Sequence, residues 1–343
     1  MWKHLGRSLS WRDERHSDHE RPRRSQRRVT SEAHGDWLEC LPDGALELML
    51  LCLDHETLHA FEATSRSCRG AMRSVAFWRS SIENRLACYE ASTLSEGARL
   101  AHWKRMHCLR QHHEGFTSET LLTSVAGFDS HNAFSVPPTW LMYKSRCWFW
   151  MEKLLSKSDH VDDASLYVRQ LHCRCGYRVP CFWCSAGSGS ADTSSYIDFH
   201  VRADCFLASV EIVPYQAHWL PGHPAFAPQH VSFSVLHYDE ETPEVTSVFF
   251  ETAAFPVQNA MVLQRFELPK TVWVSTRCVL RVHLIGRTER APIEERLWIP
   301  AAPTDEKQYY CCLSHINATG FVVQEETKKK RKWWYQVPIH HHH

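Results

Sequence analysis

The chain has 343 residues and no net charge, with 39 Lys plus Arg and 39 Asp plus Glu. A body without net charge has no field that would draw it to nucleic acid or to an anionic membrane, so neither is expected as a partner. Hydrophobic residues make up 43% of the chain, which is typical of a globular protein and excludes disorder over most of its length. The length predicts roughly two or three domains.

The fourteen cysteines raise the question of a secreted disulfide framework. That interpretation needs a signal peptide, and the first residues carry no apolar core. The longest apolar-rich stretch, residues 46–53, is far shorter than the roughly 20 residues that cross a bilayer. The sequence therefore predicts a reducing compartment, cytoplasmic or nuclear or both, where most cysteines are small buried apolar residues.

The two ends of the chain differ from its middle. Residues 1–35 are polar and charged without a hydrophobic period, and residues 325–343 are basic, so both are predicted to be solvated tails. The tract 328–332 has the size of a nuclear localisation signal and is equally typical of a solvated tail.

Residues 36–82 are predicted to form three short amphipathic helices, because apolar residues recur there at spacings of three and four. Leu41-Pro42-Asp43 is typical of a helix start. Proline lacks the donor that a first turn leaves unpaired, and an acidic side chain favours the positive end of a helix. A unit this small buries little surface, so we expect it to be stabilised by docking on a partner.

Several residues of this module occur in the order of a known pattern. They are Leu41-Pro42, Leu46, Leu50, Leu53, Leu58, Phe61, Ser65-Arg66, Cys68-Arg69 and Phe77-Trp78-Arg79. This pattern resembles the F-box family. The chain departs from it at Arg69-Gly70-Ala71, where the family usually has an aromatic residue soon after the cysteine. The alternative interpretation is a generic three-helix bundle.

The resemblance implies a role in ubiquitin transfer. An F-box binds a Skp-type adaptor, which links it to a cullin scaffold and a RING protein. The chain would then be a substrate-receptor subunit of an SCF-type ubiquitin ligase, with an unidentified protein as its target. The adaptor contacts implied by the resemblance are Leu41, Pro42, Leu46, Leu50, Leu53 and Trp78.

The rest of the chain divides into a linker and a β domain. Residues 83–165 are predicted to be helical and irregular, with a helix at 96–112. In residues 166–324, short segments rich in Val, Ile and Phe alternate with Pro, Gly and Asn, which predicts an antiparallel sandwich or barrel. The expected strands are 195–201, 205–213, 230–237, 246–251, 262–267, 278–287 and 309–319.

The stretches 182–185, 212–217, 263–269 and 309–316 carry a second resemblance. They are similar to the carboxy-terminal domain of a plant-type F-box family, which is a discoidin or galactose-binding-like jelly roll. The predicted fold class is therefore α+β multidomain. It comprises a three-helix F-box, a helical linker and an antiparallel β-sandwich.

Tyr215, Gln216, His218 and Trp219 lie between two predicted strands. Aromatic side chains on a loop can stack on a sugar or anchor a peptide, which makes these residues a candidate target or ligand site. Aromatics beside a turn also close the end of a sandwich. Both interpretations stay open, and the first allows a carbohydrate- or ligand-binding protein without a ligase role.

The strongest metal candidate consists of Cys173, Cys175, Cys181 and Cys184. Four thiolates can hold zinc tetrahedrally. However, the two pairs lie closer together than in standard structural sites, and Cys184 also fits an aromatic strand of the β domain. We therefore expect no metal or other cofactor. The sequence has no zinc-protease, nucleophile-elbow or Walker motif, so we also expect no catalytic residues.

Overall fold

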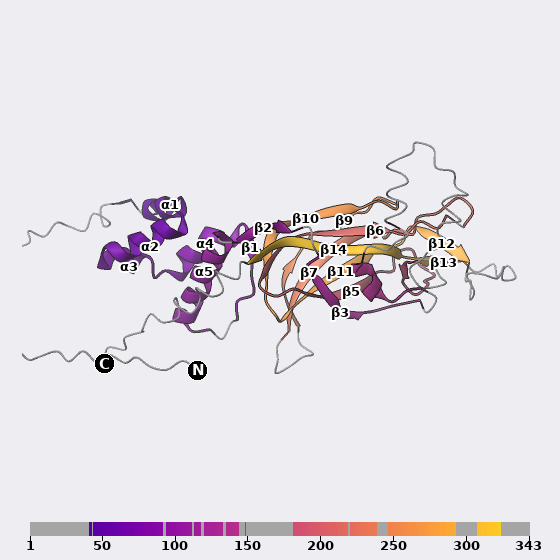
Figure 1. The fold of residues 1–343 in the computed structure, drawn as a ribbon, viewed down its shortest axis with the longest axis horizontal. Helices are drawn as coiled ribbons and strands as arrows, with labels where there is room; N and C mark the ends of the chain where they lie inside the picture. The colour runs from indigo at the N-terminus through magenta and orange to yellow at the C-terminus, as the bar shows by residue number, and fades with distance from the viewer. Residues whose placement is uncertain are drawn as a thin grey trace, which may run out of the picture. The chain divides into compact units, whose positions relative to one another are not determined.

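The computed structural model has a helical segment first and a pair of β-sheets after it (Figure 1). It describes residues 41–42, 44–91, 94–111, 113–117, 120–132, 135–143, 148, 181–218, 220–238, 246–292 and 307–323. This order of elements confirms the predicted α+β class. Both predicted tails lie outside the described residues.

Four helices occupy the segment predicted as three. They are α1 (Ala45–Leu51), α2 (His55–Thr64), α3 (Arg66–Ala71) and α4 (Val75–Glu83). The additional division falls at Ser65, which has an extended backbone and whose side chain accepts a hydrogen bond from the Cys68 N–H. Such a residue caps a new helix and cannot continue the previous one. Asp54 and Ser74 cap α2 and α4 in the same way.

The helix α5 (Glu96–Gln111) follows, one residue shorter than predicted. It packs against α4 and α2. Leu58, Trp78, Trp103 and Met106 are all buried in the helical segment. The apolar stripes of these helices therefore form a core of their own.

The first sheet has the strand order β1-β10-β6-β14-β2, with β4 also paired to β14. Its strands are β1 (Leu86–Ala87), β2 (His113–Thr117), β4 (Trp183–Cys184), β6 (Cys205–Pro214), β10 (Gln264–Val274) and β14 (Cys312–Val323). The pair β1–β10 is parallel, and the other pairs of this sheet are antiparallel.

The second sheet is antiparallel and has the order β3-β5-β11-β7-β8, with β9 paired to β7. Its strands are β3 (Leu122–Phe128), β5 (Ser195–Val201), β7 (His230–Tyr238), β8 (Thr246–Glu251), β9 (Phe255–Pro256) and β11 (Cys278–Ile285). A hairpin of β12 (Glu289–Pro292) and β13 (Lys307–Tyr310) and a 3-10 helix, η2 (Pro138–Met142), complete the described elements.

The two sheets form the layers of a sandwich (Figure 1). Their facing side chains share one core, which includes Val210 and Val272 from the first sheet and Phe199, Phe233 and Leu280 from the second. All five are fully buried. This core confirms the predicted β-sandwich. It also explains why the alternating segments of the sequence were recognisable as strands.

The sandwich includes strands from residues that the sequence assigned to the linker. β1, β2 and β3 all lie within residues 83–165 and pair with strands of the sandwich. In β3 only Leu122 is buried, so the alternation that reveals a strand is weak there. Among the described helices, none combines the length and apolar character needed to span a membrane.

Candidate functional site

The helix α1 begins after a turn at Pro42 and Gly44. The Ala45 N–H donates to the Pro42 carbonyl oxygen at 2.9 Å. Gly44 has a φ of 78°, which glycine adopts without the strain that a side chain would add. The sequence had placed Pro42 in the first helical turn, whereas the helix begins three residues later.

Three large apolar side chains of α1 are exposed. The exposed fractions of Leu48, Met49 and Leu51 are 68%, 54% and 41%. Leu48 and Leu51 are three positions apart and so lie on the same side of the helix. Single exposed apolar residues are common, but Leu48 and Leu51 are exposed together on one side of a short helix, and Met49 lies next to Leu48 about 100° further round. We call these three residues the α1 apolar surface.

The predicted adaptor contacts differ in exposure. Pro42 is exposed, Leu41, Leu46 and Leu53 are half-buried, and Leu50 and Trp78 are buried. Sequence reasoning missed the α1 apolar surface because it selected apolar residues at helical spacing. That spacing identifies the face that packs inward. Met49 follows this spacing with Leu46 and Leu50 and is nevertheless exposed, so the spacing of residues within α1 could not have identified the surface.

Trp78 is a packing residue of the helical segment. Its indole N–H donates to the Met72 carbonyl oxygen at 2.9 Å, and its ring makes an edge contact with His107 at 5.2 Å between centroids. The Lys104 Nζ lies 5.3 Å from the centroid of the indole ring. Because the side chain is fully buried, it can support the helices around it but offers no area to a partner in this conformation.

The predicted loop site of the sandwich is mostly closed. Tyr215 is 1% exposed and stacks on Phe182 with 4.1 Å between ring centroids. Gln216 Nε2 donates to the carbonyl oxygen of His223, and His218 is buried. Trp219 lies outside the described residues. The burial of Tyr215 and His218 fits the interpretation that these residues close the end of the sandwich.

The four cysteines of the metal candidate are only partly described. Cys181 and Cys184 are buried, and Cys173 and Cys175 lie outside the described residues. Cys184 instead faces Cys312 across the β4–β14 pair. Burial and the contact with Cys184 raise the pKa of the Cys312 thiol. No cluster of three metal-binding side chains occurs in the part of the chain that the structure describes.

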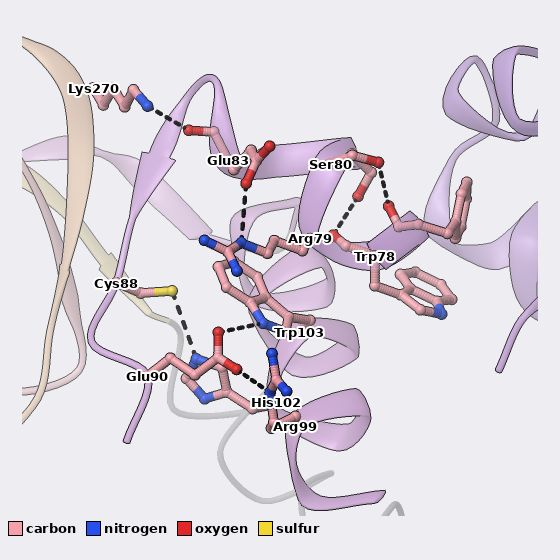
Figure 2. Close-up of polar contacts among 12 residues, drawn as sticks. Trp78, Arg79, Ser80, Glu83, Cys88, Glu90, Arg99, His102, Trp103 and Lys270 are labelled. Atoms are coloured by element: carbon pink, nitrogen blue, oxygen red, sulfur yellow. Dashed lines mark hydrogen bonds and ion pairs between the residues drawn. The ribbon is translucent and has the colours of Figure 1, made fainter. Parts of the chain in front are cut away.

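A polar cavity of about 590 Å³ lies where α4, β1 and α5 meet side chains from β8 and β10. Figure 2 shows its polar contacts. We call it the charged pocket and define it by six of its lining residues: Arg79, Glu83, Glu90, Arg99, Trp103 and Lys270.

The two carboxylates of the charged pocket accept hydrogen bonds, Glu83 from within α4 and Glu90 from α5. Arg79 Nε donates to Glu83 at 3.0 Å within α4. Glu90 accepts from Trp103 Nε1 at 3.0 Å and from Arg99 Nε on its other oxygen. Burial alone would raise the pKa of Glu90, but these two hydrogen bonds and the nearby arginines lower it overall. Glu90 therefore stays ionised at neutral pH.

A hydrogen bond from β10 joins this network to the sheet. Lys270 Nζ donates to the backbone oxygen of Glu83 at 2.8 Å (Figure 2). Next to it, the Thr271 N–H donates to the Arg85 carbonyl oxygen at 3.0 Å. The charged pocket thus combines residues that are far apart in sequence. No sequence motif predicted it.

These features define a protein with two potential binding parts, a helical module with an exposed apolar helix and a β-sandwich. No family model matches the chain. It is 23% identical over 165 residues to a curated F-box protein of Arabidopsis thaliana, a match that covers 42% of this chain. The match spans 40% of the length of that relative. This similarity confirms the resemblance of the chain to F-box proteins.

Two solved structures are similar to the chain at low identity. One is chitosan-binding module 1 of a chitosanase/glucanase from Paenibacillus sp. IK-5, with 11% identity and a TM-score of 0.29 over 59% of this chain and 97% of the module. The other is a family 32 carbohydrate-binding module from C. perfringens NanJ in complex with galactose, with 6% identity and a TM-score of 0.28. That match covers 56% of this chain and 90% of the module.

Proposed function

We propose that the chain is a substrate-receptor subunit of an SCF-type cullin–RING ubiquitin ligase and has no catalytic site of its own. The observation that carries this proposal is the α1 apolar surface, at the start of the module that resembles an F-box. An apolar patch of this kind is stabilised when a partner covers it. The similarity to a curated F-box protein supports the same class of partner.

In this proposal the helical module binds a Skp-type adaptor. Leu48 and Leu51 would fill apolar pockets of the adaptor, and Met49 would adapt to its surface, as methionine does at many interfaces. Glu47 accepts a hydrogen bond from the Ser80 hydroxyl of α4 at 3.0 Å. The same hydroxyl also lies 3.0 Å from the Phe77 carbonyl oxygen, so this exposed bond is one of two alternatives for Ser80.

The sandwich would hold the target protein. In such a receptor no residue performs chemistry. Its effect is to keep target lysines at a high local concentration beside the ubiquitin-loaded enzyme that the cullin and RING subunits bring.

Coexpression of the full chain with a Skp-type adaptor tests this proposal. We expect the double variant Leu48→Ser, Met49→Ser to bind the adaptor at least about tenfold more weakly, because it removes the centre of the apolar contact. Both side chains are exposed in the free chain, so its free energy of unfolding should change little. Titration calorimetry of the purified partners measures the affinity.

A matched control comes from the sandwich. Val262 and Leu263 are 40% and 43% exposed, and the variant Val262→Ser, Leu263→Ser removes a smaller exposed apolar area far along the sequence. It should bind the adaptor like the unmodified chain. The proposal fails if the unmodified chain does not bind, or if both double variants bind with the same affinity.

A further inference from the structure

The charged pocket has more positive than negative groups. Arg79, Arg99 and Lys270 contribute three positive charges, and Glu83 and Glu90 contribute two negative ones, which leaves one positive charge. The low pKa of Glu90 keeps the second negative charge in place at neutral pH. The pocket is therefore suited to a group with a single negative charge.

The charged pocket also has more unused hydrogen-bond donors than unused acceptors. Both oxygens of Glu90 are occupied, one by Arg99 and one by Trp103. Arg79 and Arg99 each use their Nε for a carboxylate. Among the described residues, no acceptor meets the terminal guanidinium nitrogens of either arginine. These nitrogens are donors that a ligand with acceptor oxygens can satisfy.

The indole ring of Trp103 contacts Arg79 in the charged pocket. The Arg79 guanidinium carbon lies 5.8 Å from the centroid of the Trp103 ring, within the range of a cation–π contact. Trp103 is 4% exposed and is held by its hydrogen bond to Glu90. Arg79, whose side chain is 51% exposed, thus contacts both Trp103 and Glu83 in the free chain.

We propose that the charged pocket binds a carboxylate of a partner polypeptide, either an Asp or Glu side chain or the carboxy-terminal group. A carboxylate carries one negative charge, and its two oxygens match the paired terminal nitrogens of an arginine. A phosphoryl group also matches the edge of an arginine and carries more negative charge, so a phosphoserine library separates the two anions. The cavity, at about 590 Å³, has room for the carboxylate and the residues beside it.

This inference deepens the proposed function and rests on it for one point, that the polypeptide is the ligase target. The target, held by the sandwich, would then also reach α4 and α5 with an acidic residue or a chain end. The charged pocket shares no residue with the α1 apolar surface, so the binding of target and adaptor can be measured separately.

Degenerate nonapeptide libraries test the inference on the immobilised full chain. Three amidated libraries carry Glu, Gln or phosphoserine at the centre, and a fourth has no acidic side chain but a free carboxy terminus. We expect the Glu library, the free-terminus library or both to be retained better than the Gln library. Retention of one or the other identifies the source of the carboxylate.

Two variants and a control locate the binding. We expect Arg79→Gln to reduce the preference for the carboxylate by about tenfold, the effect of one charged hydrogen-bonding group. Glu83→Gln should increase retention, because it removes the negative charge that competes with the ligand for Arg79. A misfolded variant cannot produce this gain. Arg290→Gln, an exposed change on β12, should leave retention unchanged.

Three results would overturn the inference. They are equal retention of the Glu, Gln and free-terminus libraries, stronger retention of the phosphoserine library, and weaker binding by Glu83→Gln. Adaptor affinity is measured on the same preparations. If the chain prefers carboxylate peptides but does not bind the adaptor, the proposed function is contradicted. The inference that the charged pocket binds a carboxylate is then still supported.

Discussion

Arg281 and Asp198 lie opposite each other across β11 and β5. The guanidinium donates through Nε and Nη2 to the two carboxylate oxygens, each at 2.8 Å. The Asp198 side chain is only 6% exposed. The Arg281 guanidinium carbon also lies 4.1 Å from the centroid of the Tyr196 ring, on the same strand pair. This residue pair fixes the register of two strands with one interaction of good geometry.

Loss of Arg281 would leave the Asp198 carboxylate buried without its partner. We expect Arg281→Met to lower the free energy of unfolding by about 3 kcal/mol. The Asp198 carboxylate would stay buried without a positive partner to offset the cost of removing it from water. Urea denaturation of the full chain measures the change. Arg290→Met, at an exposed position whose guanidinium carbon lies 4.3 Å from the centroid of the Tyr309 ring, should lower stability by no more than about 1 kcal/mol. Equal stabilities of the two variants would contradict this role.

At the residue scale, the sequence predicted helices better than it predicted surfaces. Helical spacing correctly pointed to Leu50 as a regular member of α1, and the structure buries it. The same spacing could not indicate that Leu48 and Met49 are exposed, because exposure depends on which helices pack against α1. A pattern in one helix contains no information about its neighbours.

At the scale of elements, Gly320 determines how closely β14 approaches β6. A Cβ at this position would overlap the Phe206 carbonyl oxygen of β6 and would also meet the Ala208 nitrogen at 3.0 Å. The pairing of the two strands shifts register between Thr319 and Gly320. Glycine is required here because the partner is backbone, which cannot rotate away as a side chain can.

We expect Gly320→Ala to destabilise the sandwich by roughly 1–3 kcal/mol or to prevent its folding, because the strands must separate to admit the methyl group. Thermal unfolding followed by circular dichroism measures the effect. The control is Gly189→Ala, where no heavy atom lies within 4 Å of the added Cβ. A chain that tolerates both changes equally would show that β14 can move away from β6 without cost.

The predictability of a strand depended on its length and burial. β5 and β8 were predicted with their observed bounds, because alternating or apolar segments of six or seven residues end at turns. β1 and β4 have two residues each, too few for any period. Leu86 becomes a strand residue because Thr271 lies beside it, and that partner is nearly two hundred positions away. Such a pairing is a tertiary effect.

At the scale of the whole molecule, the described cysteines differ widely in reactivity. Cys52 is exposed, whereas Cys205 is buried and its pKa is raised to about 12 by burial. At pH 8 only about one Cys205 thiol in ten thousand would be a thiolate, the form that reacts. We expect Cys52→Ser to remove one fast-reacting thiol in a native DTNB assay, and Cys205→Ser to remove none. The opposite pattern would contradict the burial of Cys205.

The charged pocket also belongs to the scale of the whole molecule. Arg79 and Trp103 come from two helices, and Lys270 comes from the sheet. Each residue alone resembles an ordinary surface or core position. Their grouping follows from the packing of the helices and the pairing of β1 with β10, so the sequence could indicate the module and the sandwich but not this site.

The outermost strands limit how the protein can be divided for study. β1, β2 and β3 precede residue 166, and they cover β10, β14 and β5. A fragment of residues 166–324 would leave the backbone donors and acceptors of those three strands open to pairing with other chains, which is a common origin of aggregation. A separately expressed sandwich must therefore begin before Leu86, or glycan and peptide measurements on it would report a damaged fold.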